Sequence, residues 1–437
     1  MENKYKNSYN LLQNDLKNKI LMLDGAMGTM IQRENLTADD FGGEKYEGCN
    51  DYLVLQRPDI IKNIHKGYLE AGSDIIETNS FGALDIVLKD YDLEDKAFEM
   101  NKAAAELVNE AIAEYRSKHP EVTRNLYVAG ALGPSNKSIS VTGGVTFEEL
   151  IHSYYTAVSG LLAGGVDLIL FETIQDTRNL KAAYLGLKKA MEENYTVPLM
   201  LSFTIESTGT TLAGQSADAF YYAVNHMNPF SVGLNCATGP EFMTQFLKTL
   251  NNISNTYISV YPNAGLPNED GEYEETPDTL SAKIEPFFQN NYLNIVGGCC
   301  GTTPEHIQKI KEKSVNYSPR VIDENKDFND VSGLIALEMP KDRPVYVGER
   351  TNVIGSRIFK NLIASEKFDE ATEVARLQIK GRADVIDICL ANPDRDEIAD
   401  MKSFLDKVAK FAKIPLMIDS TDINVVKEGL TYLQGKG

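Results

Sequence analysis

Two adjacent cysteines, Cys299 and Cys300, lie in the stretch NIVGGCCGTTPEHI between a pair of glycines and a probable helix start. Side chains alternate between the two faces of a strand, so neighbouring cysteines cannot both enter one core from a regular strand. A turn can direct both sulfurs to one side, and Gly301 directly after the pair suits such a turn. The pair therefore indicates a site rather than a packed core.

A third cysteine, Cys236 in GLNCATGP, also follows a short apolar run. Three thiolates that meet at one end of a sheet form a soft site suited to Zn²⁺. They leave one tetrahedral position open, which is typical of catalytic zinc, and an open position beside thiolates suits a substrate thiol. The sequence thus favours alkyl transfer to sulfur. The alternative is that these are ordinary buried cysteines.

Other metal chemistry is less favoured. Zinc hydrolases mostly use histidine and carboxylate ligands. The five histidines lack metal-ligand spacing, and we expect them to be surface or packing residues: His65, His119, His152, His226 and His306. A structural zinc needs a fourth Cys or His, and the candidate Cys49 in KYEGCNDYL shows no such spacing.

Acidic residues end three further apolar runs: Asp24 in DGAMGT, Glu77 in ETNSFG and Glu172 in FET. Carboxylates grouped at one end of a sheet can bind the α-amino group of an amino acid. The alternative roles are helix capping and ion pairing. The glycine-rich turn that starts at Gly25 offers backbone amides to a carboxylate.

The elements that must position these residues are short apolar runs alternating with helical stretches. The helix predicted over 58–72 has Pro58 at its start and Gly72 past its end, and the helix over 146–165 begins with a capping box. Eight such runs predict an α/β fold, a (β/α)₈ TIM barrel with function at the carboxyl ends of its strands. The alternative is a doubly wound open sheet. The runs are 20–23, 74–77, 126–132, 167–172, 198–204, 231–235, 257–261 and 293–297.

The pattern stops after the eighth run and restarts further along the chain. We predict a barrel over 1–315, a linker over 316–343 and a partial second (β/α) barrel over 344–437. The second region has three apolar runs, 344–349, 384–389 and 415–420. Three strands cannot close a barrel, so we expect a fragment of a longer protein.

Bulk composition limits the partners. The net charge of −20 over 437 residues argues against nucleic acid or an anionic membrane surface as the main partner. No apolar run approaches the ~20 residues of a membrane helix, and the polar N-terminus lacks a signal peptide. Five cysteines without an export signal favour reduced thiols and a cytoplasmic location.

These residues match a known family. LDGAMGT, ETNSFG, FET, GLNCATGP and GGCCGTTPEHI, in this order, resemble the homocysteine S-methyltransferase domain. VGERTNVIGS, DVIDI and MIDS resemble the start of the methyltetrahydrofolate-binding, or pterin-binding, domain. Together they resemble the N-terminal part of the cobalamin-dependent methionine synthase family, over essentially the whole chain.

The resemblance implies roles for individual residues. Cys236, Cys299 and Cys300 are implied as zinc ligands and catalytic residues. For homocysteine, Asp24 and Glu172 are implied at the amino group and Gly25 and Thr78 along the backbone, with Glu77 as a secondary candidate. The residues implied at the pterin are Glu349, Asn352, Asp387 and Asp419. Many relatives carry Asn where this chain has Cys389, and Asn392 is the nearby candidate to replace it.

The resemblance also implies the reaction and its cofactors. Homocysteine bound at zinc takes a methyl group from methylcobalamin, which 5-methyltetrahydrofolate recharges, and methionine forms. The cobalamin-binding domain, absent from this chain, would act in cis or in trans. We expect the chain alone to bind homocysteine and zinc, with folate binding impaired. The alternatives are a stand-alone methyltransferase with a sulfonium or betaine-type donor and a non-catalytic zinc-thiolate protein.

Overall fold

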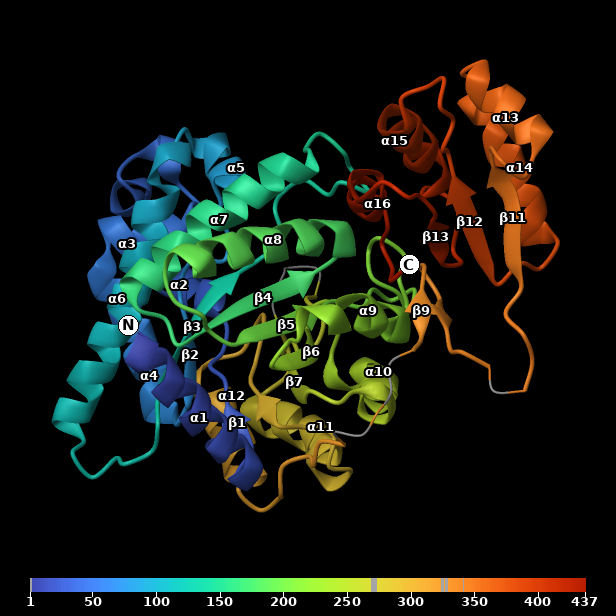
Figure 1. Ribbon diagram of the computed structural model, residues 1–437. Helices are drawn as coiled ribbons and strands as arrows, with labels where there is room; N and C mark the ends of the chain where they lie inside the picture. The colour runs from blue at the N-terminus through green and yellow to red at the C-terminus, as the bar shows by residue number, and fades with distance from the viewer. Residues whose placement is uncertain (1, 269–272, 324–325, 327–328, 341) are drawn as a thin grey trace.

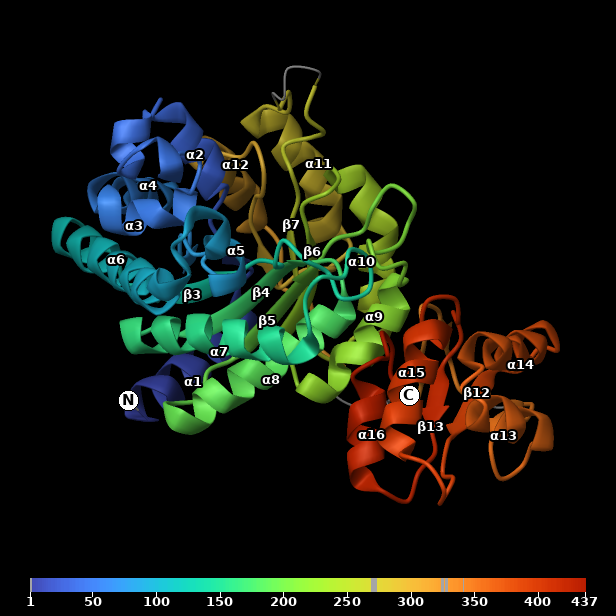
Figure 2. The ribbon, with the colours of Figure 1, turned by 90° about the horizontal axis from the view of Figure 1, so that it is seen from above.

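The computed structural model describes residues 2–268, 273–323, 326, 329–340 and 342–437, with the side chains of 2–7 excepted. The chain forms a large barrel unit and a smaller second unit beside it (Figure 1). Figure 2 shows the second unit at the side of the barrel where helices α8 (Thr177–Glu193) and α9 (Ala217–Val224) lie.

The barrel sheet has eight parallel strands in the ring order β1-β8-β7-β6-β5-β4-β3-β2. Leu21 pairs with Ile295 between the first and last strands, and a single parallel bridge from Leu23 to Ile75 joins the remaining two edges. The predicted barrel is therefore confirmed, and the open-sheet alternative is wrong because the ring closes. The strands are β1 (Leu21–Met22), β2 (Ile75–Glu77), β3 (Tyr127–Leu132), β4 (Leu168–Ile174), β5 (Leu199–Phe203), β6 (Ser231–Asn235), β7 (Tyr257–Tyr261) and β8 (Ile295–Val296).

Helices surround the ring, and the two predicted in detail are confirmed. Helix α4 begins at Pro58 and ends before Gly72, whose φ of 100° suits glycine. Helix α7 follows the Thr146 capping box. The other barrel helices are α2 (Met27–Arg33), α3 (Leu53–Gln56), α5 (Asp85–Leu88), α6 (Ala97–Lys118), α10 (Pro240–Ile253), α11 (Pro277–Gln289) and α12 (Pro304–Ser314), with α4 spanning Pro58–Ala71 and α7 Phe147–Gly164.

An additional helix, α1 (Glu2–Asn18), packs against the barrel interior. Its Leu12 and Leu16 are fully buried in one cluster with Leu21, Ile75 and Tyr257 from the strands. These apolar side chains close the end of the barrel opposite to the strand carboxyl ends. The sequence pattern did not predict this helix, because most of its residues are polar.

The second unit is a three-stranded parallel sheet, ordered β11-β12-β13, with helices packed on it. Its core includes Phe359 and Phe404, whose rings meet edge to face at 5.1 Å. The outer edges of β11 and β13 pair with no strand among the described residues. The elements are β11 (Val347–Asn352), α13 (Arg357–Ala364), α14 (Phe368–Lys380), β12 (Val385–Cys389), α15 (Glu397–Val408), β13 (Leu416–Ile418) and α16 (Ile423–Leu430).

The segment between the two units contacts both. Arg320 is buried and donates hydrogen bonds to the carbonyls of Ser254 and Thr256 in the barrel. A short hairpin of β9 (Val331–Ser332) and β10 (Ala336–Leu337) packs on α9, where Ser332 Oγ donates to the carbonyl of Ala219 at 3.0 Å. The region predicted as a linker thus contains ordered structure along part of its length.

Helix α8 supplies the main polar contacts to the second unit. Arg178 Nε donates to the Thr431 carbonyl at 2.8 Å, and its guanidinium lies over the Tyr432 ring. Lys181 Nζ donates to the carbonyls of Leu433 and Gly435 at 2.8 and 2.7 Å. In the described part of the chain, every helix is too short or too polar to cross a membrane.

Candidate metal and substrate site

The three predicted thiols meet at the carboxyl ends of β6 and β8. Cys236 Sγ lies 3.8 Å from Cys300 Sγ, and Cys299 Sγ lies 4.0 Å from Cys300 Sγ. A tetrahedral zinc with Zn–S bonds of about 2.3 Å requires sulfur–sulfur distances of about 3.8 Å. The donor set therefore fits Zn²⁺ in both chemistry and spacing.

In the part of the chain that the structure describes, no histidine or fourth cysteine joins this cluster. Among the described residues, these three cysteines are the one group of three or more His, Cys, Asp or Glu side chains whose ligand atoms all lie within 4.8 Å. Cys49 is buried elsewhere, and all five cysteines are free thiols. A closed structural zinc site with Cys49 as fourth ligand is thus not formed.

Strained backbone directs the sulfurs. Cys236 has a φ of 57°, an uncommon conformation for a residue with a side chain, and its amide donates to the Tyr261 carbonyl at 3.3 Å. Gly301 has a φ of 80°, and a Cβ there would meet the ring of Tyr273 at 2.3 Å. Only glycine fits this turn, which places Cys299 and Cys300 on the same side.

The close approach of the thiols changes their acidity. Hydrogen bonds from Cys236 and Cys299 lower the pKa of Cys300 to about 3. The reciprocal hydrogen bonds and burial raise the pKa of Cys299 well above the usual range. The close packing of the three sulfurs thus favours a thiolate at Cys300, which favours cation binding.

Three carboxylates, Asp24, Glu77 and Glu172, face the same end of the barrel. Burial raises the pKa of each above its usual value, and burial together with the charge of Cys300 raises the pKa of Glu172 to about 8. Asp24 Oδ2 accepts from the Glu77 amide at 3.1 Å, whereas Asp24 Oδ1 and Glu77 Oε1 are buried without a partner among the described residues. Such a group of acids fits a cationic ligand such as an ammonium.

The turn around Gly25 is packed too tightly for a larger residue. A Cβ at Gly25 would lie 2.8 Å from Thr302 Oγ1 and 2.9 Å from the Tyr68 ring. Thr302 Oγ1 also accepts a hydrogen bond from the Ala26 amide and donates one to the Cys299 carbonyl. It therefore connects the turn that follows Asp24 with the turn of the cysteine pair. The turn of Asp24 and Gly25 is thereby fixed beside the cysteine pair.

Thr78 lies next to these groups, but its hydroxyl is already engaged. Thr78 Oγ1 accepts from the Ala131 amide at 3.0 Å and shares a hydrogen bond with Ser80 Oγ. These bonds tie β2 to β3. A contact of this hydroxyl with the amino acid stays a prediction.

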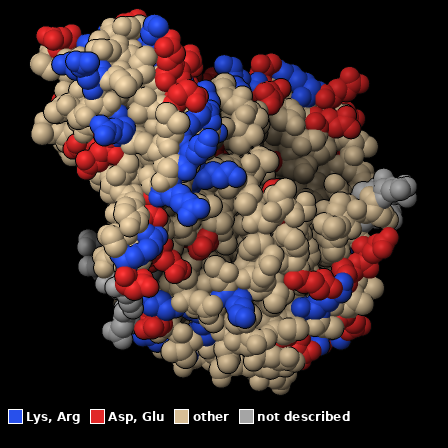
Figure 3. Space-filling model, turned by 90° about the vertical axis from the view of Figure 1, so that its right-hand side faces the viewer, with Lys and Arg blue, Asp and Glu red and all other residues tan. Residues whose placement is uncertain are grey.

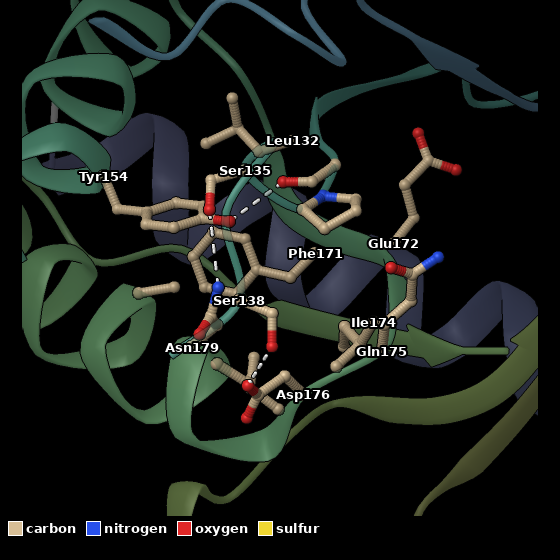
Figure 4. A pocket seen from close by; sticks show the side chains of 14 residues that line it. Leu132, Ser135, Ser138, Tyr154, Phe171, Glu172, Ile174, Gln175, Asp176 and Asn179 are labelled. Carbon is tan, nitrogen blue, oxygen red and sulfur yellow. Dashed lines mark hydrogen bonds between the residues drawn. The ribbon is translucent and has the colours of Figure 1, made fainter. Parts of the chain in front are cut away.

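The side of the molecule that carries the strand ends is hollowed beside the second unit (Figure 3). A pocket at the carboxyl end of β4 is lined by Glu172 together with residues from the ends of β3 and β4, the loops after them, α7 and α8 (Figure 4). In it, Ser138 Oγ donates to Asp176 Oδ2 at 2.5 Å and Tyr154 donates to the Gly133 carbonyl at 2.9 Å. Glu172 points away from these bonded groups (Figure 4).

The residues implied at the pterin gather at the strand ends of the second unit. Asn352 Nδ2 donates to Asp387 Oδ2 at 3.1 Å, and Asp387 Oδ1 is buried without a partner among the described residues. Burial raises the pKa of Asp387, and the charges of Asp419 and Glu349 raise it further. Glu349 and Asp419 themselves are exposed.

Cys389 departs from the family pattern and is the last residue of β12, and Asn392, its candidate replacement, follows three residues later. Cys389 is buried at the end of this strand. Asn392 Oδ1 accepts a hydrogen bond from the Asp394 amide at 3.3 Å and so stabilises the local turn. Whether either residue contacts a pterin stays a prediction.

Residues that the sequence reasoning missed also line the site. Asn235, directly before Cys236, donates to Cys299 Sγ at 3.9 Å. Asn263 is buried, and its Oδ1 lacks a partner among the described residues. The Tyr273 hydroxyl donates toward Cys300 and helps to lower its pKa. The position of Asn235 directly before Cys236 could have identified it from the sequence. Asn263 and Tyr273 lie in loops, where no hydrophobic periodicity or motif marks them.

A closed (β/α)₈ barrel with a three-cysteine site at its carboxyl end is an architecture suited to an enzyme that acts on a thiol. Residues 21–314 match the homocysteine S-methyltransferase family, and residues 348–437 match the family described as pterin binding enzyme. The first match spans more than half of the chain, which therefore belongs to the homocysteine S-methyltransferase family. This order of segments is that of the N-terminal region of methionine synthase.

Solved structures agree with the fold. The homocysteine methyltransferase MmuM from Escherichia coli in its metallated form is 24% identical with a TM-score of 0.57, covering 70% of this chain and 100% of that chain. Its oxidized form is 22% identical with a TM-score of 0.57, covering 70% of this chain and 99% of that chain. The similarity lies in the barrel architecture.

Proposed function

We propose that this chain transfers a methyl group to the sulfur of homocysteine at a zinc ion held by Cys236, Cys299 and Cys300. The observation that carries the proposal is the spacing of the three thiols, which matches a tetrahedral zinc with one position left open. Zinc bound there would supply Lewis acidity that lowers the pKa of a thiol in the open position. The buried acids beside the cysteines give the substrate its orientation.

In this proposal the α-amino group of homocysteine lies among Asp24, Glu77 and Glu172. An ammonium would restore the ionised form of these carboxyl groups, because a nearby positive charge opposes the effect of burial on their pKa. The amides of the Gly25 turn would receive the substrate carboxylate. The site would then select for an amino acid in which the α-amino group and the thiol are as far apart as the acids and the cysteines of the site.

The proposed methyl source is 5-methyltetrahydrofolate, with cobalamin as the carrier between the two units. The support is the pterin-binding segment that follows the barrel in the same chain. The convergence of Asn352, Asp387, Asp419 and Glu349 fits the hydrogen-bonding edge of a pterin. A donor of the sulfonium or betaine type would leave the second unit without a role.

The zinc assignment is tested with Cys299→Ser, with Cys49→Ser as the matched control. We expect Cys299→Ser to lose bound zinc and methionine formation while its far-UV circular dichroism stays that of the wild type. Cys49→Ser should keep both. Wild-type zinc content and activity in Cys299→Ser would overturn the assignment.

The donor is tested by supplying homocysteine with methylcobalamin, S-methylmethionine or betaine in separate assays. We expect methionine to form with methylcobalamin, slowly because the carrier is free in solution. Faster turnover with either small donor would establish the stand-alone alternative. Failure of all three with a zinc-loaded protein would overturn the proposal for this chain.

A further inference from the structure

Asn235, the last residue of β6, connects the thiol and carboxylate parts of the site. Its side chain is fully buried. Oδ1 accepts from the Thr173 amide at 3.0 Å and from Ser202 Oγ at 2.6 Å. Nδ2 donates to Thr173 Oγ1 at 2.8 Å and to Cys299 Sγ at 3.9 Å.

These partners determine which way the amide group faces. A backbone amide can only donate, so the atom that faces Thr173 N must be the oxygen of the Asn235 side chain. The amino group then faces Cys299, where it presents an N–H to the sulfur. The backbone amide of Thr173 in β4 therefore determines the orientation of the Asn235 side-chain amide.

The contact with Thr173 holds a strained bulge. The register of β4 against β5 shifts between Phe171 and Ile174, and Thr173 there has a φ of 54°. A β-branched residue in this region costs energy and persists only where its surroundings hold it. The bulge directly follows Glu172, so it sets the direction in which that carboxylate leaves the strand.

We propose that Asn235 is a positioning residue with two separable tasks. Its Oδ1 holds the Thr173 bulge and so aims Glu172 at the substrate amino group, and its Nδ2 donates to Cys299 Sγ and stabilises that sulfur as a metal-binding thiolate. Groups that hydrogen-bond to metal ligands typically change metal affinity ~10- to 100-fold when they are removed. The inference rests on the proposed zinc and homocysteine function of this site.

Two substitutions separate the tasks. Asn235→Asp keeps an acceptor for Thr173 N and Ser202 Oγ, but it replaces the N–H donor with an oxygen that faces the sulfur. Asn235→Leu removes both. The matched control is Asn294→Asp, because Asn294 is equally buried, accepts from the Ile258 amide and donates to the Arg320 carbonyl away from the site.

Three measurements on the whole chain distinguish the two tasks of Asn235. Zinc affinity is measured by chelator competition, and the sulfur environment by the charge-transfer absorption of the cobalt-substituted protein. Binding of L-norleucine, which has the α-amino group but no sulfur, is measured by calorimetry. Circular dichroism and thermal unfolding report the fold of every variant.

We expect Asn235→Asp to bind zinc ~10-fold more weakly and to shift the charge-transfer band, with norleucine affinity near that of the wild type. Asn235→Leu should lose affinity for both zinc and norleucine, and Asn294→Asp should lose only stability. Wild-type zinc affinity and spectrum in Asn235→Asp would overturn the inference, even if Asn235→Leu fails to fold. A wild type that binds no zinc would instead overturn the proposed function.

Discussion

The barrel and the second unit carry acids at equivalent strand ends but in different surroundings. In the barrel, Asp24 and Glu172 are 2% and 6% exposed inside a closed ring. In the second unit, Asp387 is buried, whereas Glu349 and Asp419 lie exposed at the ends of an open sheet. The comparison teaches that the closed ring buries several acids together whereas the open sheet buries only Asp387 among its strand-end acids, and that in both units burial raises the pKa of the buried carboxyl groups.

The largest expected effect comes from testing whether the two units are independent. Phe404→Ala should destabilise the second unit by about 3–5 kcal/mol, because Phe404 is fully buried against Phe359. The barrel should keep its fold and its zinc. Calorimetric unfolding together with zinc analysis checks this, with the half-exposed Phe98→Ala as control. Loss of zinc from the variant would show that the barrel depends on its neighbour.

A second prediction contrasts one acid from each unit. With methylcobalamin as donor, Glu172→Gln should lower kcat/KM for homocysteine about 10- to 100-fold, the loss typical of a hydrogen bond to a charged group. Asp387→Asn should leave this reaction unchanged, because Asp387 lies in the second unit, at the ends of other strands than those that carry Glu172. Steady-state kinetics of both variants measure the contrast. Equal losses would place the two acids in one site.

The pH dependence of stability sharpens the same comparison. The pKa of Glu172 is raised to about 8, so between about pH 4.5 and 8 the folded barrel keeps a proton that the unfolded chain has lost. Stability of the zinc-free protein should therefore fall as pH rises through this window, at most about 1.4 kcal/mol per pH unit from this group. Denaturant unfolding from pH 5 to 8 tests it, and Glu172→Gln should flatten the slope. An unchanged slope in Glu172→Gln would refute the assignment to this residue.

The smallest expected effect concerns the junction of the units. Arg178→Ala removes a hydrogen bond to the Thr431 carbonyl and the stacking on Tyr432, which should weaken docking by about 1 kcal/mol. Faster protease cleavage between the units, with barrel activity unchanged, is the expected readout. Lys62→Ala, which removes surface ion pairs on α4, should leave cleavage unchanged.

Much of the fold could be predicted from the sequence because parallel strands buried on both faces are apolar throughout. All eight apolar runs became strands, and Cys236, Cys299 and Cys300 meet where strand order places them. Helix α1 was missed because only a few residues of its polar stretch, such as Leu12 and Leu16, face the barrel. The hairpin of β9 and β10 was missed because two-residue strands leave no periodicity.

The finer structure of the site depends on long-range contacts that no local pattern encodes. Asn235 bonds to residues 62, 33 and 64 positions away along the chain. Tyr273 interacts with Cys300 from a polar loop, and nothing in the sequence of that loop distinguishes it from other polar loops. Such contacts become visible only when the ring brings the strand ends together.

The pairing of Leu21 with Ile295 also has a consequence for the timing of synthesis. A ribosome adds about 5–20 residues per second, so the first strand waits roughly 14–55 s for the last one to be made. Throughout that interval the turn of Asp24 exists without the Cys299 turn, whose Gly298 amide later donates to the Asp24 carbonyl. The nascent chain therefore cannot assemble the complete three-cysteine site until this last strand has left the ribosome, and any ion that the three thiols bind together can be taken up only after that point.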